Sequence, residues 1–181
     1  LVMEILKDGT VKVSNANVSL STLEDLKRNL MIFYTGKRRL NKTILGEQDS
    51  ATKKSEKQVL ESLHYIKNSG YKILETVESG NITDLGILFD EHWKYKKKMA
   101  KGISSPELDA IYELAKQNGA IGGKVSGAGG GGFFTLYCED KQAQLRAAMA
   151  KAGLRELKYN FDFEGTKVLG NFMSYSPDTI S

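Results

Sequence analysis

Four consecutive glycines, Gly129 to Gly132, stand immediately before an apolar segment that runs from Phe133 to Cys138. Glycine loses more conformational freedom on folding than any other residue, so such a run is costly unless the fold needs positive φ angles or a bare backbone. The aromatic and β-branched residues of the apolar segment predict a strand. A glycine-built turn into a strand is therefore expected, and its bare N–H groups could form an anion-binding concavity. The alternative is a tight crossing from helix to strand that only needs small residues.

Two common nucleotide-binding motifs do not fit this loop. A Walker loop fails because Gly123-Lys124 is preceded at the required position by Asn118 and followed by Val125. The spacing of Gly127, Gly129 and Gly132 matches the dinucleotide fingerprint, but that fingerprint must open a helix, and a strand is predicted here. The loop must therefore be judged on its own geometry.

Composition excludes several classes of protein. The chain has 181 residues, of which 40% are hydrophobic and 27% charged, the balance of a soluble globular protein. No stretch of about 18 apolar residues occurs and the start lacks the pattern of a signal peptide, so we expect no membrane partner and a cytoplasmic location. The net charge of +4 could favour anionic ligands but is too small to predict a nucleic-acid partner. A single cysteine, Cys138, predicts neither an internal disulfide nor a thiolate metal site.

The predicted elements segregate into strands and helices. A hairpin is expected where Asp8-Gly9 separates two β-rich segments, and Leu30 to Tyr34, apolar throughout, predicts a central strand. Alternation of aromatic and polar residues from Lys158 to Glu164 predicts a half-exposed strand. Four helices are expected, at about residues 49–78, from Asn81, from Pro106 to a stop at Gly119, and at about residues 140–152. The order favours an α+β domain over residues 1–173, with helices on one face of a mixed or antiparallel sheet, and a polar tail over residues 174–181.

The loop and its flanks, Gly123-Lys124-Val125-Ser126-Gly127-Ala128-Gly129-Gly130-Gly131-Gly132-Phe133-Phe134, closely resemble the third, C-terminal motif of the GHMP kinases. That family is named for galactokinase, homoserine kinase, mevalonate kinase and phosphomevalonate kinase. Three further segments resemble the branch that phosphorylates D-glycero-D-manno-heptose 7-phosphate at its anomeric oxygen: Tyr34-Thr35-Gly36 with Arg38 and Arg39, Asp90-Glu91-His92-Trp93, and Phe163-Glu164-Gly165-Thr166. The resemblance implies a ferredoxin-like C-terminal domain, with ATP and Mg²⁺ as cosubstrates and a phosphorylated sugar as acceptor.

The chain departs from the family pattern in its proline content. The family's second motif, Pro-x-x-x-Gly-Leu-Gly-Ser-Ser, opens a helix that faces the nucleotide phosphates, yet prolines occur here only at positions 106 and 177, and neither introduces such a string. We therefore expect the chain to be the C-terminal half of a kinase whose N-terminal nucleotide-binding domain is its missing partner. We expect no catalytic residue in this half and no kinase activity from it alone. The alternative is a stand-alone α+β module that binds a small anion without catalysis.

The resemblance also assigns candidate binding residues. The loop residues Ser126, Gly127, Ala128, Gly129, Gly130 and Gly131 are expected to line the cleft and approach the nucleotide or substrate phosphate. On the lysine-rich helix, His92 with Lys97 or Lys98 is expected to hold the phosphate of the sugar. Arg38, after the central strand, could grip phosphate or serve only as a solubilising surface charge. The competing interpretation of the helix is a solvated basic face with aromatic residues packed beneath it.

Overall fold

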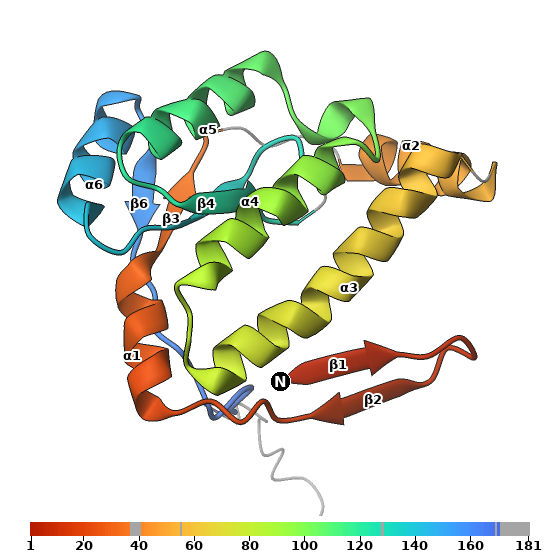
Figure 1. The fold of residues 1–181 in the computed structure, drawn as a ribbon, viewed down its shortest axis with the longest axis horizontal. Helices are drawn as coiled ribbons and strands as arrows, with labels where there is room; N and C mark the ends of the chain where they lie inside the picture. Colours follow the sequence, from red (N-terminus) through yellow and green to blue (C-terminus); the bar gives the residue numbers. More distant parts are fainter. Residues whose placement is uncertain (37–40, 55, 128, 169, 171–181) are drawn as a thin grey trace, which may run out of the picture.

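The computed structural model describes residues 1–36, 41–54, 56–127, 129–168 and 170, and Figure 1 shows their arrangement. Two sheets are present in this part of the chain, a two-stranded hairpin and a four-stranded sheet. The strands are β1 Val2–Ile5, β2 Val11–Ser14, β3 Leu30–Tyr34, β4 Gly122–Val125, β5 Phe133–Tyr137 and β6 Arg155–Leu157. The helices are α1 Leu20–Asn29, α2 Asn41–Lys53, α3 Lys57–Ser79, α4 Asp84–Lys97, α5 Pro106–Gln117 and α6 Gln142–Lys151, with a 3-10 turn, η1, over Lys101–Ile103.

The larger sheet has the ferredoxin-like topology. Its strand order is β4-β5-β3-β6, every neighbouring pair is antiparallel, and the chain order is β3-α5-β4-β5-α6-β6. This is the split β-α-β arrangement, in which two β-α-β units interlock. Helices α2, α3 and α4 are inserted between β3 and α5. The predicted α+β class and the central position of β3 are confirmed.

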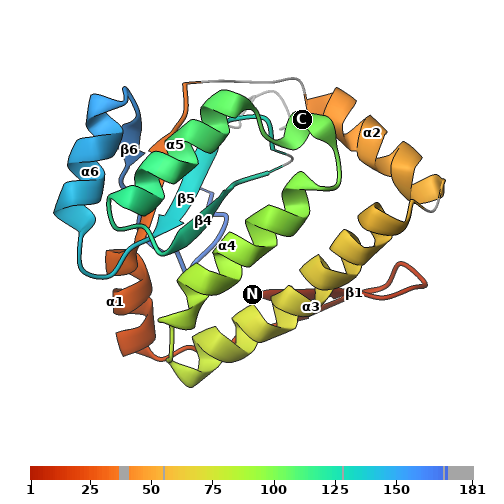
Figure 2. The same cartoon turned by 45° about the horizontal axis from the view of Figure 1, so that its top comes forward.

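One face of this sheet is closely packed. Helices α5 and α6 lie over it, as Figure 2 shows, and their buried side chains share a core with those of β3 and β5.

Helix α4 lies along β4, and the two backbones touch: a Cβ atom on Gly122 would lie 1.9 Å from the carbonyl oxygen of Gly86. Because this contact tolerates no side chain at Gly122, it fixes the distance between α4 and the strand that leads into the glycine loop.

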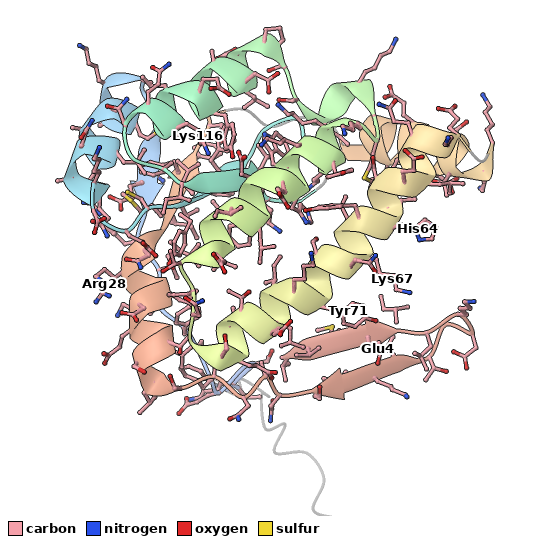
Figure 3. All side chains as sticks on the ribbon, in the orientation of Figure 1. Glu4, Arg28, His64, Lys67, Tyr71 and Lys116 are labelled. Carbon is pink, nitrogen blue, oxygen red and sulfur yellow. The ribbon has the colours of Figure 1, made fainter. Side chains whose placement is uncertain are left out.

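The hairpin is joined to the rest of the molecule through α3. The Tyr71 hydroxyl of α3 lies 3.5 Å from Oε1 of Glu4, a residue of β1 (Figure 3). Gly9 adopts a φ of +84°, which a hairpin turn at Asp8-Gly9 requires. The predicted hairpin is therefore confirmed.

Several predicted boundaries are wrong. The helix expected over residues 49–78 is two helices, of which α2 begins at Asn41 and α3 continues through Gly70 without a break, and α1 was not predicted at all. The helix expected from Asn81 begins at Asp84. No strand covers residues 158–164: the strand is β6, which ends at Leu157, and the Asp162 carboxylate accepts hydrogen bonds from the amides of Glu164 and Gly165 to make a turn. The expected tail, residues 174–181, lies outside the described residues.

Candidate functional site

The glycine-rich loop, residues 126–132, joins β4 to β5, and its glycines lie in the left-handed region of backbone space. Gly127, Gly129, Gly130, Gly131 and Gly132 all have positive φ angles, between 74° and 132°. Residues that carry a side chain rarely adopt such φ angles, so the path of the backbone explains why the loop consists mainly of glycine. Its base is held by hydrogen bonds. The Ser126 amide donates to the Phe133 carbonyl at 2.8 Å. Thr35 donates to the Gly132 carbonyl from its amide, at 2.9 Å, and from its hydroxyl, at 3.1 Å, and the same hydroxyl accepts from the Gly132 amide at 3.0 Å.

The middle of the loop is buried against η1. The Gly130 amide donates to the Ile103 carbonyl at 2.8 Å, and a Cβ atom on Gly129 would lie 2.9 Å from the Ile103 Cα. Gly129 and Gly130 are both buried, so these two predicted binding residues meet the requirement for small residues in close packing. The Gly130 N–H is already bonded and does not face an anion. Ala128, also predicted to line the cleft, lies outside the described residues.

The beginning of the loop, in contrast, is exposed. Ser126 and Gly127 lie at the surface, and the Ser126 hydroxyl is 3.0 Å from that of Thr135 on β5. The Lys96 ammonium of α4 donates to the carbonyl oxygens of Val125, at 3.3 Å, and Gly127. Helix α4 therefore fixes the exposed end of the loop directly, through a side chain that the sequence analysis did not select.

A basic cluster surrounds this end of the loop. Burial, with the nearby charges of Lys124 and Lys96, lowers the pKa of His92 to about 4, so its imidazole is neutral near pH 7. Burial and the charge of Lys124 lower the pKa of Lys96 to about 8, and burial lowers the pKa of Lys124. His92 Nδ1 lies 3.3 Å from the Ser69 hydroxyl, and Lys124 Nζ lies 5.3 Å from the centre of the Phe89 ring. The side chains of His92, Lys96 and Lys124 therefore share one electrostatic environment.

Lys97 and Lys98 have other partners. Lys97 Nζ pairs with the Asp109 carboxylate at 2.9 Å and lies 5.8 Å from the Trp93 ring centre, while Lys98 Nζ lies 4.3 Å from the Tyr95 ring centre. The structure thus groups His92 with Lys96 and Lys124, not with Lys97 and Lys98. Helical spacing could have found Lys96, since residues four apart share a helix face. Arg38 lies outside the described residues.

A second polar cluster, centred on Asp90, holds α4, α5 and β4 together. The Asp90 carboxylate accepts a hydrogen bond from the Tyr112 hydroxyl at 2.5 Å and pairs with Lys94 at 2.6 Å and Lys116 at 3.6 Å. Lys116 also donates to the carbonyl of Ile121, the residue before β4. With three partners, this carboxylate acts as a structural anchor.

Neither a metal-ligand cluster nor a membrane-spanning helix occurs in the described ranges. They contain no group of three or more histidine, cysteine, aspartate or glutamate side chains that could hold a metal ion. None of their helices combines the length with the apolar character needed to cross a bilayer.

Comparison with known proteins identifies the domain. Residues 73–154, from α3 through α4 and the glycine loop to the end of α6, match the family model described as GHMP kinases C terminal. The chain contains a GHMP kinase C-terminal domain. It is 30% identical over 165 residues to D-glycero-alpha-D-manno-heptose 7-phosphate kinase of Campylobacter jejuni, an alignment that covers 91% of this chain and 47% of that kinase.

Solved structures of kinases share its fold. Leishmania major mevalonate kinase superposes with a TM-score of 0.67 at 16% identity, over 80% of this chain and 43% of that one. A D-glycero-D-manno-heptose 1-phosphate kinase from Bacteroides thetaiotaomicron superposes with a TM-score of 0.60 at 19% identity, over 88% of this chain and 41% of that one. The chain spans about half the length of the Campylobacter kinase, so the GHMP domain described here corresponds to part of a longer relative.

Proposed function

We propose that this GHMP domain is the C-terminal part of an ATP-dependent sugar kinase that transfers the γ-phosphoryl group of ATP to a hydroxyl of a heptose phosphate or a related sugar. The observation that carries the proposal is the exposed end of a GHMP-type glycine loop beside a basic cluster. The likeness to a heptose 7-phosphate kinase over 91% of the chain supports the acceptor class.

The residues present suit positioning more than bond-making. Phosphoryl transfer depends almost entirely on positioning and on electrostatic stabilisation of the developing charge. The exposed Ser126 hydroxyl and the ammonium groups of Lys96 and Lys124 can orient a phosphorylated substrate. The paired Asp90 is committed to α5 and β4, so we assign no catalytic base to the described part of the chain.

The described residues also bear on how the expected cosubstrates, ATP and Mg²⁺, would be bound. Lys124 and the exposed loop end fit the phosphate groups of a nucleotide or of a sugar phosphate. The described residues offer no carboxylate cluster for Mg²⁺, so no step is assigned to the metal here. ATP and Mg²⁺ would be held chiefly by an N-terminal nucleotide-binding domain, which we propose as the partner of this one.

An ADP-release assay tests the proposal. The chain is assayed with ATP, Mg²⁺ and D-glycero-D-manno-heptose 7-phosphate, first alone and then fused behind the N-terminal half of the Campylobacter jejuni kinase. We expect turnover from the fusion and none from the chain alone or from that N-terminal half alone. Turnover by the isolated chain would contradict the assignment of catalysis to a two-domain cleft.

The second candidate function is a stand-alone module that binds a small anion. The basic cluster favours it, because anion binding at these lysines requires no second domain. If an efficiently folded fusion releases no ADP while the isolated chain binds the sugar phosphate, the module is the better description.

A further inference from the structure

Lys96 and Lys124, here named the lysine pair, differ from the other cations that surround them. Lys94 and Lys116 pair with Asp90, and Lys97 pairs with Asp109. Within the part of the chain that the structure describes, neither member of the lysine pair has a carboxylate partner. Lys96 bonds only to main-chain carbonyl oxygens, and Lys124 contacts the face of Phe89.

Keeping two like charges together in a partly buried place is unfavourable. Each ammonium loses hydration, and each repels the other, so both effects oppose the charged form. Both side chains are partly buried, and His92, which is neutral near pH 7, adds no negative charge. An anion placed against the pair would offset both costs at once.

The surroundings of the pair supply further donors to such an anion. The Ser126 hydroxyl is exposed and lies 3.0 Å from the Thr135 hydroxyl, so one of the two can donate outward while it accepts from the other. Lys124 carries three ammonium protons, and in the described residues no acceptor takes them. Lys96 has one proton left after its two carbonyl bonds.

We propose that Lys124, Lys96 and the Ser126 hydroxyl form a binding site for a phosphate group at the exposed end of the glycine loop. Lys124 is the point charge, and Lys96 both binds the phosphate and positions the loop. The inference deepens the proposed function, since it assigns the phosphate of the acceptor to these residues. The terminal phosphate of a nucleotide has the same chemistry, so the experiment compares the two sources.

Isothermal titration calorimetry of the chain tests the site with four probes: mannose 6-phosphate, mannose, inorganic phosphate and ATP. We expect the phosphorylated probes to bind more tightly than mannose and to compete with one another. Replacing Lys124 by methionine, which keeps much of the stem, should weaken phosphate binding by about tenfold or more, because it removes a charged hydrogen-bond donor to the phosphate. Lys124→Arg should retain binding within about threefold of the original value, because it retains the charge.

Lys67→Met is the matched control. Lys67 is exposed on α3 (Figure 3), and its replacement removes the same charge at a distance from the loop. An equal loss of phosphate binding in Lys67→Met and Lys124→Met would overturn the proposal, since it would mean that only net charge matters. Absence of phosphate binding to the original chain would also overturn it. The relative affinities of ATP and mannose 6-phosphate identify the source of the phosphate.

Thermal unfolding separates a binding role from a structural one. If Lys124 binds a ligand, Lys124→Met should unfold at the same or a higher temperature than the original chain without ligand, because a poorly solvated cation is removed. A lower unfolding temperature together with weaker binding would overturn the proposal in favour of a structural lysine. Phosphate binding without turnover in the fusion would contradict the kinase proposal but not this site. Turnover by the fusion that Lys124→Met leaves unchanged would contradict this site but not the kinase proposal.

Discussion

The two faces of the four-stranded sheet differ along a single strand. On β5, Phe134 and Leu136 point into the core beneath α5 and α6 and are 0% and 1% exposed. Phe133 and Thr135 point to the other face, where Phe133 is 38% exposed and Thr135 meets Ser126 of the loop. The face beneath α5 and α6 thus provides packing, whereas the other face is open and polar at its loop end and is packed around Tyr137, which is 0% exposed in a second apolar cluster with Leu85 and Phe89 of α4. Substitutions on the two faces should therefore have separable effects on folding and binding.

The largest expected difference is between two adjacent phenylalanines. Phe134→Ala should lower the free energy of unfolding by about 3–5 kcal/mol, because it leaves a cavity between Trp93 and Tyr112, whose ring centres lie 6.4 and 6.1 Å away. Phe133→Ala should cost about 1 kcal/mol, since its ring is already partly hydrated and packs against the Tyr34 ring at a centre-to-centre distance of 5.2 Å. Urea unfolding measures both values. Equal losses would show that the second face is as closely packed as the first.

A smaller contrast is expected within the glycine loop. Gly129 and Gly127 both have positive φ angles, +103° and +78°, but only Gly129 has a neighbour at its Cβ position. Gly127→Ala should cost about 1–2 kcal/mol from backbone strain alone. Gly129→Ala should cost about 1–3 kcal/mol more, because its methyl group would overlap the Ile103 backbone.

Chemical denaturation and phosphate titration of the two glycine variants sharpen this contrast. Gly129→Ala should unfold more easily, whereas Gly127→Ala should keep most of its stability and lose phosphate affinity if the exposed end of the loop binds the ligand. The opposite pattern would show that the buried part of the loop, not the exposed part, approaches the phosphate.

Local signals predicted the elements that depend on local chemistry. The Ser105 side chain accepts a hydrogen bond from the Leu108 amide at 3.3 Å, Pro106 opens α5, and Gly119 ends it with a φ of +107°. The hairpin turn and the positive φ angles of the glycine loop follow from the same kind of residue-level requirement. These features need no knowledge of distant contacts.

Tertiary contacts determined what the sequence pattern missed. Which lysine of α4 reaches the loop depends on the contact between Gly86 and Gly122, residues of two separate elements. Residues 158–164 alternate as a strand should, but the pairing of β6 with β3 ends at Leu157, and the Asp162 turn follows. Alternation shows which side of a segment could be buried, yet a strand also needs a neighbour with free backbone groups.

The smallest expected effect concerns the two histidines, His92 in the basic cluster and His64, exposed on α3 (Figure 3). The pKa of His92 is lowered from 6.5 to about 4. Between pH 6.5 and about pH 4, the unfolded chain therefore binds a proton at His92 that the folded chain does not bind. Stability from this group is therefore complete above pH 6.5 and is lost as the pH falls towards 4, by about 1 kcal/mol after allowance for solvent screening.

His92→Asn should remove that part of the acid destabilisation, while His64→Asn serves as the matched control. Free energies of unfolding at pH 7, 6, 5 and 4 are compared among the three proteins, so that the titration of the carboxylates, common to all, cancels. A smaller fall in stability for His92→Asn than for His64→Asn would confirm that the cluster beside the loop excludes a further positive charge. Identical pH profiles would mean that His92 is as well hydrated as His64, and the electrostatic difference between the loop end and the outer surface of α3 would disappear.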